Sequence, residues 1–308
     1  MRFLAPFALA ACLCAQEPPV RRPPITGVAH MALYVKDVQA SRNFYTGLLG
    51  YQECFDLKDA GGALSLTFVK VNDRQYIELF PERAAATDRL AHISIETTDA
   101  AQMRRYLASK GVPVPPSVPK GRIGNSNFNV KDPDGHTVEI VQYEPGGWSM
   151  REKGRCLPGG RVSPRMLHIG ILVGSLSRSL DFYHRILGFE ETWRGGRDPK
   201  VLSWVNLRVP EGSDYIELML YKELPAATRR GSQHHIALEV PDMDAALRWL
   251  TPRAQATGYA RPLEIRTGVN RRRQLNLFDP DGTRTELMEP RTVDGVAPPV
   301  SAAPPPIP

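Results

Sequence analysis

The strongest constraint on this 308-residue chain is an internal duplication. Three segments recur in the same order: 41–51 at 179–189, 76–79 at 215–218, and the Asp-Pro-Asp-Gly sequence of 132–135 at 279–282. A repeat of this length marks a whole domain, because domains usually hold about 100–150 residues. We therefore predict two copies of one domain, at 27–146 and 163–291. A linker rich in Gly, Pro and Arg joins them at 147–162.

Each copy divides again into two modules that share an order of elements. Four short apolar strands begin with a histidine, at His30, His92, His168 and His235. In the first module a helical pattern follows between Asp37 and Gly50, and in the second between Asp99 and Gly111. Strands separated by turn residues come after each helix. The sequence thus predicts an α+β fold in which a strand, a helix and about three strands occur four times.

A glutamate follows each of these histidines in a later strand, 47–51 residues on, at Glu78, Glu139, Glu217 and Glu286. Side chains alternate between the two faces of a strand. Met31 and Leu33 therefore share the face that packs on the helix, whereas His30 shares the opposite face with Ala32. The residue two positions after each histidine is small in all four strands. Each module should thus point one imidazole and one carboxylate toward a cavity.

Two modules together supply two histidines and two glutamates. A buried carboxylate is unfavourable unless it is paired, hydrogen-bonded or bound to a metal ion. This ligand set suits a divalent ion such as Zn²⁺, Ni²⁺, Fe²⁺ or Mn²⁺. The remaining histidines, His136, His184 and His234, lack this position in a strand, and we interpret them as surface or supporting residues.

Two motifs resemble the vicinal oxygen chelate (VOC) superfamily of glyoxalases, bleomycin resistance proteins and extradiol dioxygenases. They are the Phe-Tyr-x-x-x-Leu-Gly-aromatic helix ends and the Asp-Pro-Asp-Gly-x-x-x-Glu segments that end at Glu139 and Glu286. The resemblance covers both copies and implies two tandem VOC domains, each of paired βαβββ modules with curved mixed sheets around a cavity. It implies metal ligands at His30, Glu78, His92 and Glu139, and at His168, Glu217, His235 and Glu286.

The resemblance implies a divalent-metal-dependent enzyme that acts on a small molecule with vicinal oxygens. Lyase or isomerase chemistry would use Glu139 or Glu286 to move a proton. Dioxygenases of the superfamily carry a Tyr where Asn129 and Asn276 stand here, which weakens the extradiol dioxygenase alternative. Two other functions stay open: a protein that sequesters a small ligand without turnover, as bleomycin resistance proteins do, and a fold that keeps these residues without metal.

Which modules share a metal ion depends on how they pair. Pairing of neighbours gives one four-residue set per copy, whereas pairing of the first module with the fourth would mix the sets. The short connections at 80–91 and 220–234 favour neighbours. We therefore predict two sites, one in each copy.

The two ends of the chain predict export and disorder. Residues 1–15 place an apolar run after Arg2, as a secretory signal does, and Cys12 ends a Leu-Ala-Ala-Cys sequence typical of a lipid anchor. Ordinary cleavage near Ala15 and a plain apolar terminus are the alternatives. A periplasmic, lipid-anchored or extracellular location follows from export. The Pro-rich segments 16–26 and 292–308 are predicted to be a tether and a disordered tail.

Charge and cysteine content limit the partners. The net charge is +6, but the arginines are scattered and not interleaved with aromatic residues, so we predict no nucleic-acid partner. No apolar stretch is long enough for a transmembrane span. Exposed sheet edges would allow a homodimer. After removal of the signal, Cys54 and Cys156 are the cysteines left to form a disulfide.

Overall fold

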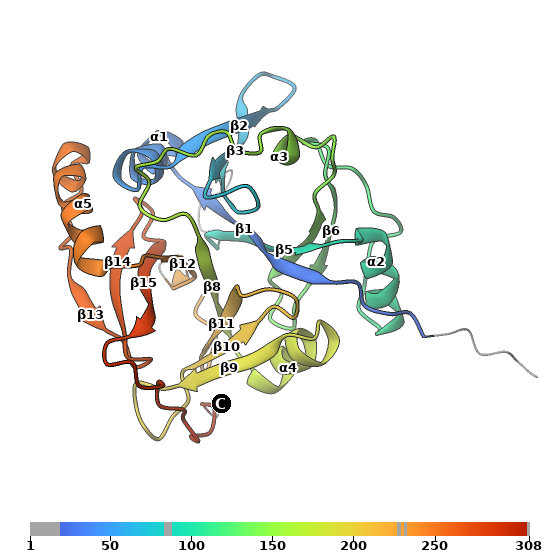
Figure 1. The fold of residues 1–308 in the computed structure, drawn as a ribbon. Helices are drawn as coiled ribbons and strands as arrows, with labels where there is room; N and C mark the ends of the chain where they lie inside the picture. The colour runs from blue at the N-terminus through green and yellow to red at the C-terminus, as the bar shows by residue number, and fades with distance from the viewer. Residues whose placement is uncertain (1–18, 83–87, 227–228, 231–232, 307–308) are drawn as a thin grey trace, which may run out of the picture.

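The computed structural model of the protein describes residues 19–82, 88–226, 229–230 and 233–306. Each copy forms one curved mixed sheet, and the two sheets lie side by side (Figure 1). The predicted signal at 1–15 and its Cys12 lie outside the described residues. Within the described part of the chain, no helix combines the length and the apolar content that crossing a membrane requires.

The first sheet has seven strands and the second has eight. The first contains β1 (Ile25–Val35), β2 (Gln52–Lys58), β3 (Leu64–Lys70), β4 (Tyr76–Pro81), β5 (Leu90–Thr97), β6 (Ser126–Lys131) and β7 (Thr137–Gln142). The second contains β8 (Met166–Val173), β9 (Glu190–Gly195), β10 (Trp204–Arg208), β11 (Tyr215–Leu220), β12 (His235–Glu239), β13 (Ile265–Thr267), β14 (Arg272–Phe278) and β15 (Arg284–Thr292). β1 therefore begins two residues inside the segment predicted to be a tether.

The strand order shows how the modules pair. It is β2-β3-β4-β1-β5-β7-β6 in the first sheet and β13-β14-β15-β12-β8-β11-β10-β9 in the second. The first strands of neighbouring modules, β1 and β5, run antiparallel at the centre, and β8 and β12 repeat this arrangement. Neighbouring modules therefore share a sheet, which confirms the predicted pairing and the α+β fold of two tandem domains.

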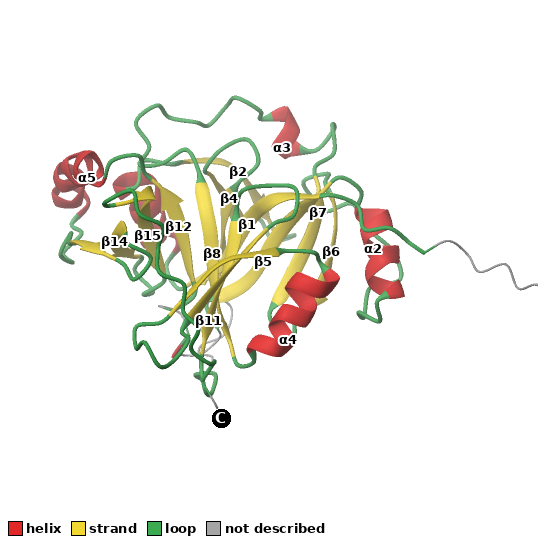
Figure 2. Ribbon diagram, turned by 60° about the horizontal axis from the view of Figure 1, so that its bottom comes forward, coloured by secondary structure: helices red, strands yellow, loops and turns green. Residues whose placement is uncertain are grey.

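The helices lie outside the strands (Figure 2). They are α1 (Val38–Arg42) with the π-helical η1 (Asn43–Leu48), α2 (Ala100–Ser109), α3 (Trp148–Arg151), α4 (Leu176–Leu180) with the π-helical η2 (Asp181–Ile186), and α5 (Met243–Thr257). The Asp37 carboxylate accepts hydrogen bonds from the first turn of α1, and Gly50 follows η1 with a φ of 74°. This left-handed backbone suits glycine, as the sequence predicts.

Helices of one copy pack on helices of the other. The Arg253 guanidinium on α5 donates to the carbonyl oxygen of Leu48 at 3.0 Å, at the end of η1. The Tyr106 hydroxyl on α2 donates to the carbonyl oxygen of Ile186 at 2.7 Å, at the end of η2. The apolar sides of both sheets and these helices form one continuous core.

The predicted linker is packed against the first sheet. The side chain of Lys70 is buried and donates to the carbonyl oxygens of Glu152 at 2.6 Å and Arg155 at 3.0 Å. Cys54 of β2 and Cys156 of the linker form a disulfide, with 5.4 Å between their Cα atoms. The two cysteines that the sequence leaves for a disulfide therefore meet.

The C-terminal tail differs from the disordered segment that its proline content predicts. The amide of Ser301 donates to the carbonyl oxygen of Arg194 at 3.1 Å, and the Trp193 indole N–H donates to that of Pro299 at 2.9 Å. Because β9 is an edge strand, the backbone groups on its outer side do not pair with another strand. One of them, the carbonyl oxygen of Arg194, accepts the hydrogen bond from the tail.

Candidate metal centre

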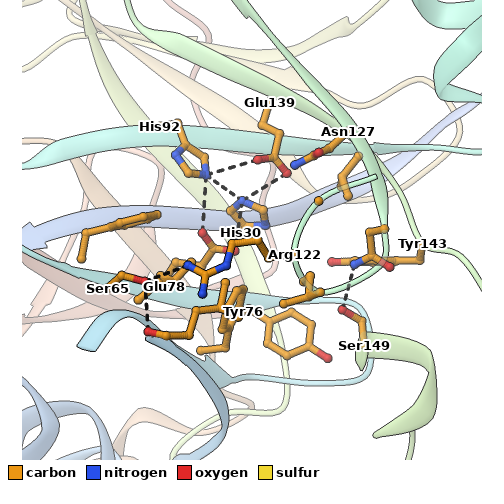
Figure 3. A pocket seen from close by; sticks show the side chains of 18 of the residues that line it. His30, Ser65, Tyr76, Glu78, His92, Arg122, Asn127, Glu139, Tyr143 and Ser149 are labelled. Atoms are coloured by element: carbon orange, nitrogen blue, oxygen red, sulfur yellow. Dashed lines mark hydrogen bonds and ion pairs between the residues drawn. The ribbon is translucent and has the colours of Figure 1, made fainter. Parts of the chain in front are cut away.

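Four strands of the first sheet bring the predicted ligands of the first copy together (Figure 3). His30 lies on β1, Glu78 on β4, His92 on β5 and Glu139 on β7. The Nε2 atoms of the two histidines are 2.9 Å apart. Each lies 3.5 Å from a Glu78 oxygen and 3.7 Å from a Glu139 oxygen. Two imidazoles and two carboxylates thus converge on one point.

The register of the strands explains this convergence. Ala32 of β1 lies opposite Glu78, and Ser94 of β5 lies opposite Glu139. Both are the small residues that follow the histidines on the same face, so the carboxylates have room to turn toward the imidazoles. The Ser94 hydroxyl also donates to Glu139 at 3.4 Å. The predicted alternation of faces therefore holds at this site.

Burial determines the charge state of these groups. It lowers the pKa of His92 to about 4, and it lowers the pKa of His30 well below its usual range, with a smaller contribution from His92. Burial raises the pKa of Glu139 to about 7, against hydrogen bonds from Asn127 and Ser94. It also raises the pKa of Glu78, and the nearby Glu139 raises it further. Neutral imidazoles beside carboxylates that lack a counter-charge form a donor set that fits a divalent ion.

The ligand atoms of His30, Glu78 and His92 also satisfy a simple geometric requirement for a shared ion. They all lie within 4.8 Å of one another. This is the two-histidine, one-carboxylate combination that many metalloenzymes use. Glu139 lies beside this group, as a fourth ligand or as a base next to the ion.

The first cluster lies in a cavity of about 490 Å³. Most of its wall is apolar or aromatic: Tyr34, Leu57, Leu66, Phe68, Tyr76, Phe80, Ile123, Val141 and Tyr143. Arg122 is the cationic side chain among the lining residues, and it is exposed. Its partners within the described ranges are the Ser65 hydroxyl at 3.2 Å and the carbonyl oxygen of Lys58, neither of which is charged.

The second copy repeats the cluster but adds a guanidinium. The Nε2 atoms of His168 and His235 are 3.0 Å apart, and His235 Nε2 lies 3.6 Å from both Glu217 and Glu286. Arg284 Nη2 lies 2.7 Å from Nδ1 of His235. Burial lowers the pKa of His235, and Arg284 lowers it further.

Burial and the neighbouring Glu286 raise the pKa of Glu217 to about 8, although Arg284 acts in the opposite direction. The distances given above show that the side chains of all four predicted residues of this copy meet, as in the first copy.

Several residues near the sites were not predicted from the sequence. Arg284 is two positions before Glu286 in the same strand, and this spacing could have identified it, because such residues share a face. The sequence predicts His136 and His234 to be surface or supporting residues, and the structure shows that neither lies at the surface. They are buried with ring centroids 5.3 Å apart, at the junction between the copies, and His136 Nδ1 lies 2.9 Å from the Asp132 carboxylate.

Comparisons with known proteins agree with this architecture. Metapyrocatechase 2 of Cupriavidus necator is 28% identical over 263 residues, which cover 80% of this chain and 75% of that protein. A Mn(II)-bound glyoxalase from Novosphingobium aromaticivorans superposes with a TM-score of 0.65 at 18% identity, covering 87% of this chain and 83% of that one. An extradiol ring-cleaving dioxygenase from B. fuscum gives a TM-score of 0.66 at 19% identity, covering 92% and 77%. At such identities, the solved structures show a shared fold.

A family model matches both copies separately. It covers residues 27–140 and 165–287, which together make up most of the chain and nearly coincide with the two repeats. The chain belongs to the Glyoxalase/Bleomycin resistance protein/Dioxygenase superfamily.

Proposed function

We propose that the first copy is the catalytic centre of a divalent-metal-dependent enzyme that moves a proton on a small molecule with two vicinal oxygens. One observation carries this proposal: two imidazoles and two carboxylates converge in a cavity with a largely apolar wall. When bound, the ion supplies Lewis acidity for adjacent substrate oxygens. The assignment to proton transfer rests on the second carboxylate, which a simple two-histidine, one-carboxylate site would not contain.

The four residues of the first cluster would have two different roles. His30, His92 and Glu78 would hold the ion. Glu139 would accept a proton from the substrate carbon next to a polarised oxygen and return it to a neighbouring atom, while the electron pair of the broken C–H bond stays on the substrate. The hydrogen bond from Ser94 orients the Glu139 carboxylate. The result is an isomerase or lyase reaction.

The cavity wall indicates the kind of substrate. Its aromatic and aliphatic side chains, such as Phe68 and Phe80, suit a flat apolar body. Arg122 is exposed and has neutral partners, so its guanidinium is free to pair with an anionic group of the substrate. We therefore propose a small molecule with an apolar body, two adjacent oxygens and one negative charge near the rim.

Extradiol-type ring cleavage is the second candidate function. It is supported by the similarity to Metapyrocatechase 2 along 80% of this chain. The aromatic wall would accept a catechol ring, and His30, His92 and Glu78 match the ligand set of non-haem iron oxygenases. In this reaction O₂ is the co-substrate, and both of its oxygen atoms enter the cleaved ring.

Two assays on the same metal-loaded protein distinguish the candidates. Exchange of substrate protons for deuterium in D₂O, followed by NMR with 2-oxoaldehydes as substrates, reports the proposed proton transfer. Oxygen consumption with catechols reports ring cleavage. Glu139→Gln should abolish exchange, whereas the matched change Glu286→Gln in the second copy should not. Oxygen uptake without exchange would favour the dioxygenase. Ligand binding without either reaction would indicate a sequestering protein and overturn the proposal.

We also propose that the protein is exported. The disulfide between Cys54 and Cys156 supports this, because disulfides persist mainly in oxidising compartments. The apolar start of the chain and its Leu-Ala-Ala-Cys sequence support it independently. Intact-mass measurement on protein from the native host tests the proposal. A chain that lacks about the first 15 residues, or that begins at a lipidated Cys12, is expected; an unprocessed chain would contradict export.

A further inference from the structure

We infer that the second His–Glu cluster is a closed site in which the guanidinium of Arg284 takes the place of a metal ion. The chain would then bind one metal ion, in the first copy. The assignment of that ion to the first copy rests on the proposed function. The observations that carry the inference come from the second copy itself.

Arg284 lies in direct contact with the cluster. Its Nη2 atom is 2.7 Å from Nδ1 and 3.1 Å from Nε2 of His235, and its Nη1 atom is 4.0 Å from Glu286. A guanidinium carries a permanent positive charge and only donates hydrogen bonds. It can therefore donate to the one acceptor nitrogen of the neutral His235 ring, and it supplies the counter-charge that two buried carboxylates need. A divalent ion would have to enter beside this fixed positive charge.

The first copy lacks this guanidinium because of a single difference between the repeats. Ile93 lies opposite Val138 in the first sheet, and Ile236 lies opposite Thr285 in the second. Thr137 therefore occupies the position that corresponds to Arg284. Its hydroxyl is too short to reach the histidines and instead accepts a hydrogen bond from Lys131 at 2.8 Å. The first cluster thus has the same carboxylates without an internal cation.

The second cluster is also less accessible than the first. His168 and His235 are both 0% exposed, whereas the side chain of His92 is 12% exposed and lines the first cavity. The Tyr215 ring stacks on the His168 ring with 4.5 Å between their centroids.

The C-terminal tail adds to this closure. Pro298 lines a cavity of about 390 Å³ together with Tyr215, Trp193 and Arg272, and none of the four predicted ligands is among the residues that line it. The hydrogen bond from the Trp193 indole to Pro299 keeps the tail on this side of the sheet. The cavity of the first copy is thus lined by its His–Glu cluster, whereas the cavity beside the tail is separated from the cluster of the second copy.

Exchanging the two corresponding residues tests the inference. The full chain is dialysed against Mn²⁺, and the ratio of bound metal to protein is measured by elemental analysis. We expect one ion per chain in the unmodified protein, two in Arg284→Thr and none in Thr137→Arg. Adding His235→Ala to Arg284→Thr should return the ratio to one, which locates the second ion. Arg291→Thr, an exposed arginine on the same strand, is the matched control and should leave the ratio at one.

Each outcome decides a separate point. Two ions in the unmodified protein, or the same number of ions in the unmodified protein and in a folded Arg284→Thr variant, would overturn the inference. No ion in the unmodified protein but one in Arg284→Thr would overturn the proposed function and leave the inference standing. If Arg284→Thr does not fold, Thr137→Arg decides: a folded variant that still binds its ion contradicts the role of the guanidinium, and one that has lost it supports that role.

Discussion

The hydroxyl of Tyr45 in the first copy donates a hydrogen bond to the carboxylate of Asp279 in the second, at 3.3 Å. The reciprocal contact joins Tyr183 of the second copy to Asp132 of the first, at 3.0 Å. These residues belong to the Phe-Tyr and Asp-Pro-Asp-Gly motifs, the most similar segments of the two repeats. The tyrosine of one motif and the first aspartate of the other therefore join the two copies.

Removing the Tyr45 hydroxyl should destabilise the protein more than removing that of Tyr183. The Asp132 oxygen that accepts from Tyr183 also lies 2.9 Å from His136 Nδ1, whereas no second partner contacts the corresponding Asp279 oxygen within the described residues. We expect Tyr45→Phe to cost about 1–3 kcal/mol and Tyr183→Phe less. Denaturant unfolding of both variants measures this, and a larger cost for Tyr183→Phe would contradict it.

Asp279 should make stability depend on pH. Burial raises its pKa from 3.8 to about 6. Between these values the folded state holds a proton that the unfolded state has lost, so this stabilising contribution is present at low pH and is lost as the pH rises toward 6. The total loss is about 3 kcal/mol.

An asparagine at position 279 cannot titrate. Between about pH 4 and pH 6, the unfolding free energy of Asp279→Asn should therefore rise relative to that of the unmodified protein. Above pH 6 the difference between the two should stay constant. Urea unfolding over this range measures the difference. If the unfolding free energies of the two proteins change with pH in parallel, Asp279 does not titrate in this way.

The disulfide should stabilise the fold without taking part in the site. Cys54 and Cys156 are separated by 102 residues, and closing a loop of this length restricts the unfolded chain strongly. We expect Cys54→Ser to lower the free energy of unfolding by about 2–5 kcal/mol. The metal content of the folded variant should match that of the unmodified protein. Reductant should reproduce the loss of stability, and an unchanged melting temperature after reduction would argue against the bridge.

Arg122 should select ligands that carry a negative charge. A guanidinium paired with a carboxylate contributes about 1.5–3 kcal/mol to binding. Arg122→Ala should therefore weaken binding of 3,4-dihydroxybenzoate by about tenfold or more and change the binding of catechol little. Calorimetry with the metal-loaded protein gives both affinities. Arg122→Lys is the conservative control and should retain part of the preference, whereas equal losses for both ligands would assign Arg122 a purely structural role.

Periodicity made the sheets and the His–Glu clusters predictable. Each histidine opens a short apolar segment of the sequence, and both glutamates of the first copy lie between apolar residues. The alternation of faces therefore brings His30, Glu78, His92 and Glu139 to one side of the sheet. Strand periodicity places Arg284 on the same face as Glu286, but it does not specify where this long, flexible side chain turns, so its contact with His235 was not predictable. The tail is a similar case, because its hydrogen bonds form with an edge strand about 100 residues earlier in the chain.

The burial of His136 and His234 arises from contact between the two copies. Neither residue has a sequence pattern that reports this contact, because each lies on a different repeat and outside the repeated histidine position. The sequence therefore leaves their place open between the surface and a supporting position, and the packing of the copies shows that both are buried. The same packing explains the contacts that the tyrosines of the Phe-Tyr motifs make with the first aspartates of the Asp-Pro-Asp-Gly segments.

We propose that the chain binds one metal ion, in the first copy, between His30 and His92. Anomalous diffraction from crystals grown with Mn²⁺ tests this most directly, because it locates the ion without relying on activity. We predict a strong anomalous peak next to the Nε2 atoms of His30 and His92, within bonding distance of Glu78, and none beside Arg284. A peak between His168 and His235, or none in the first copy, would contradict this account.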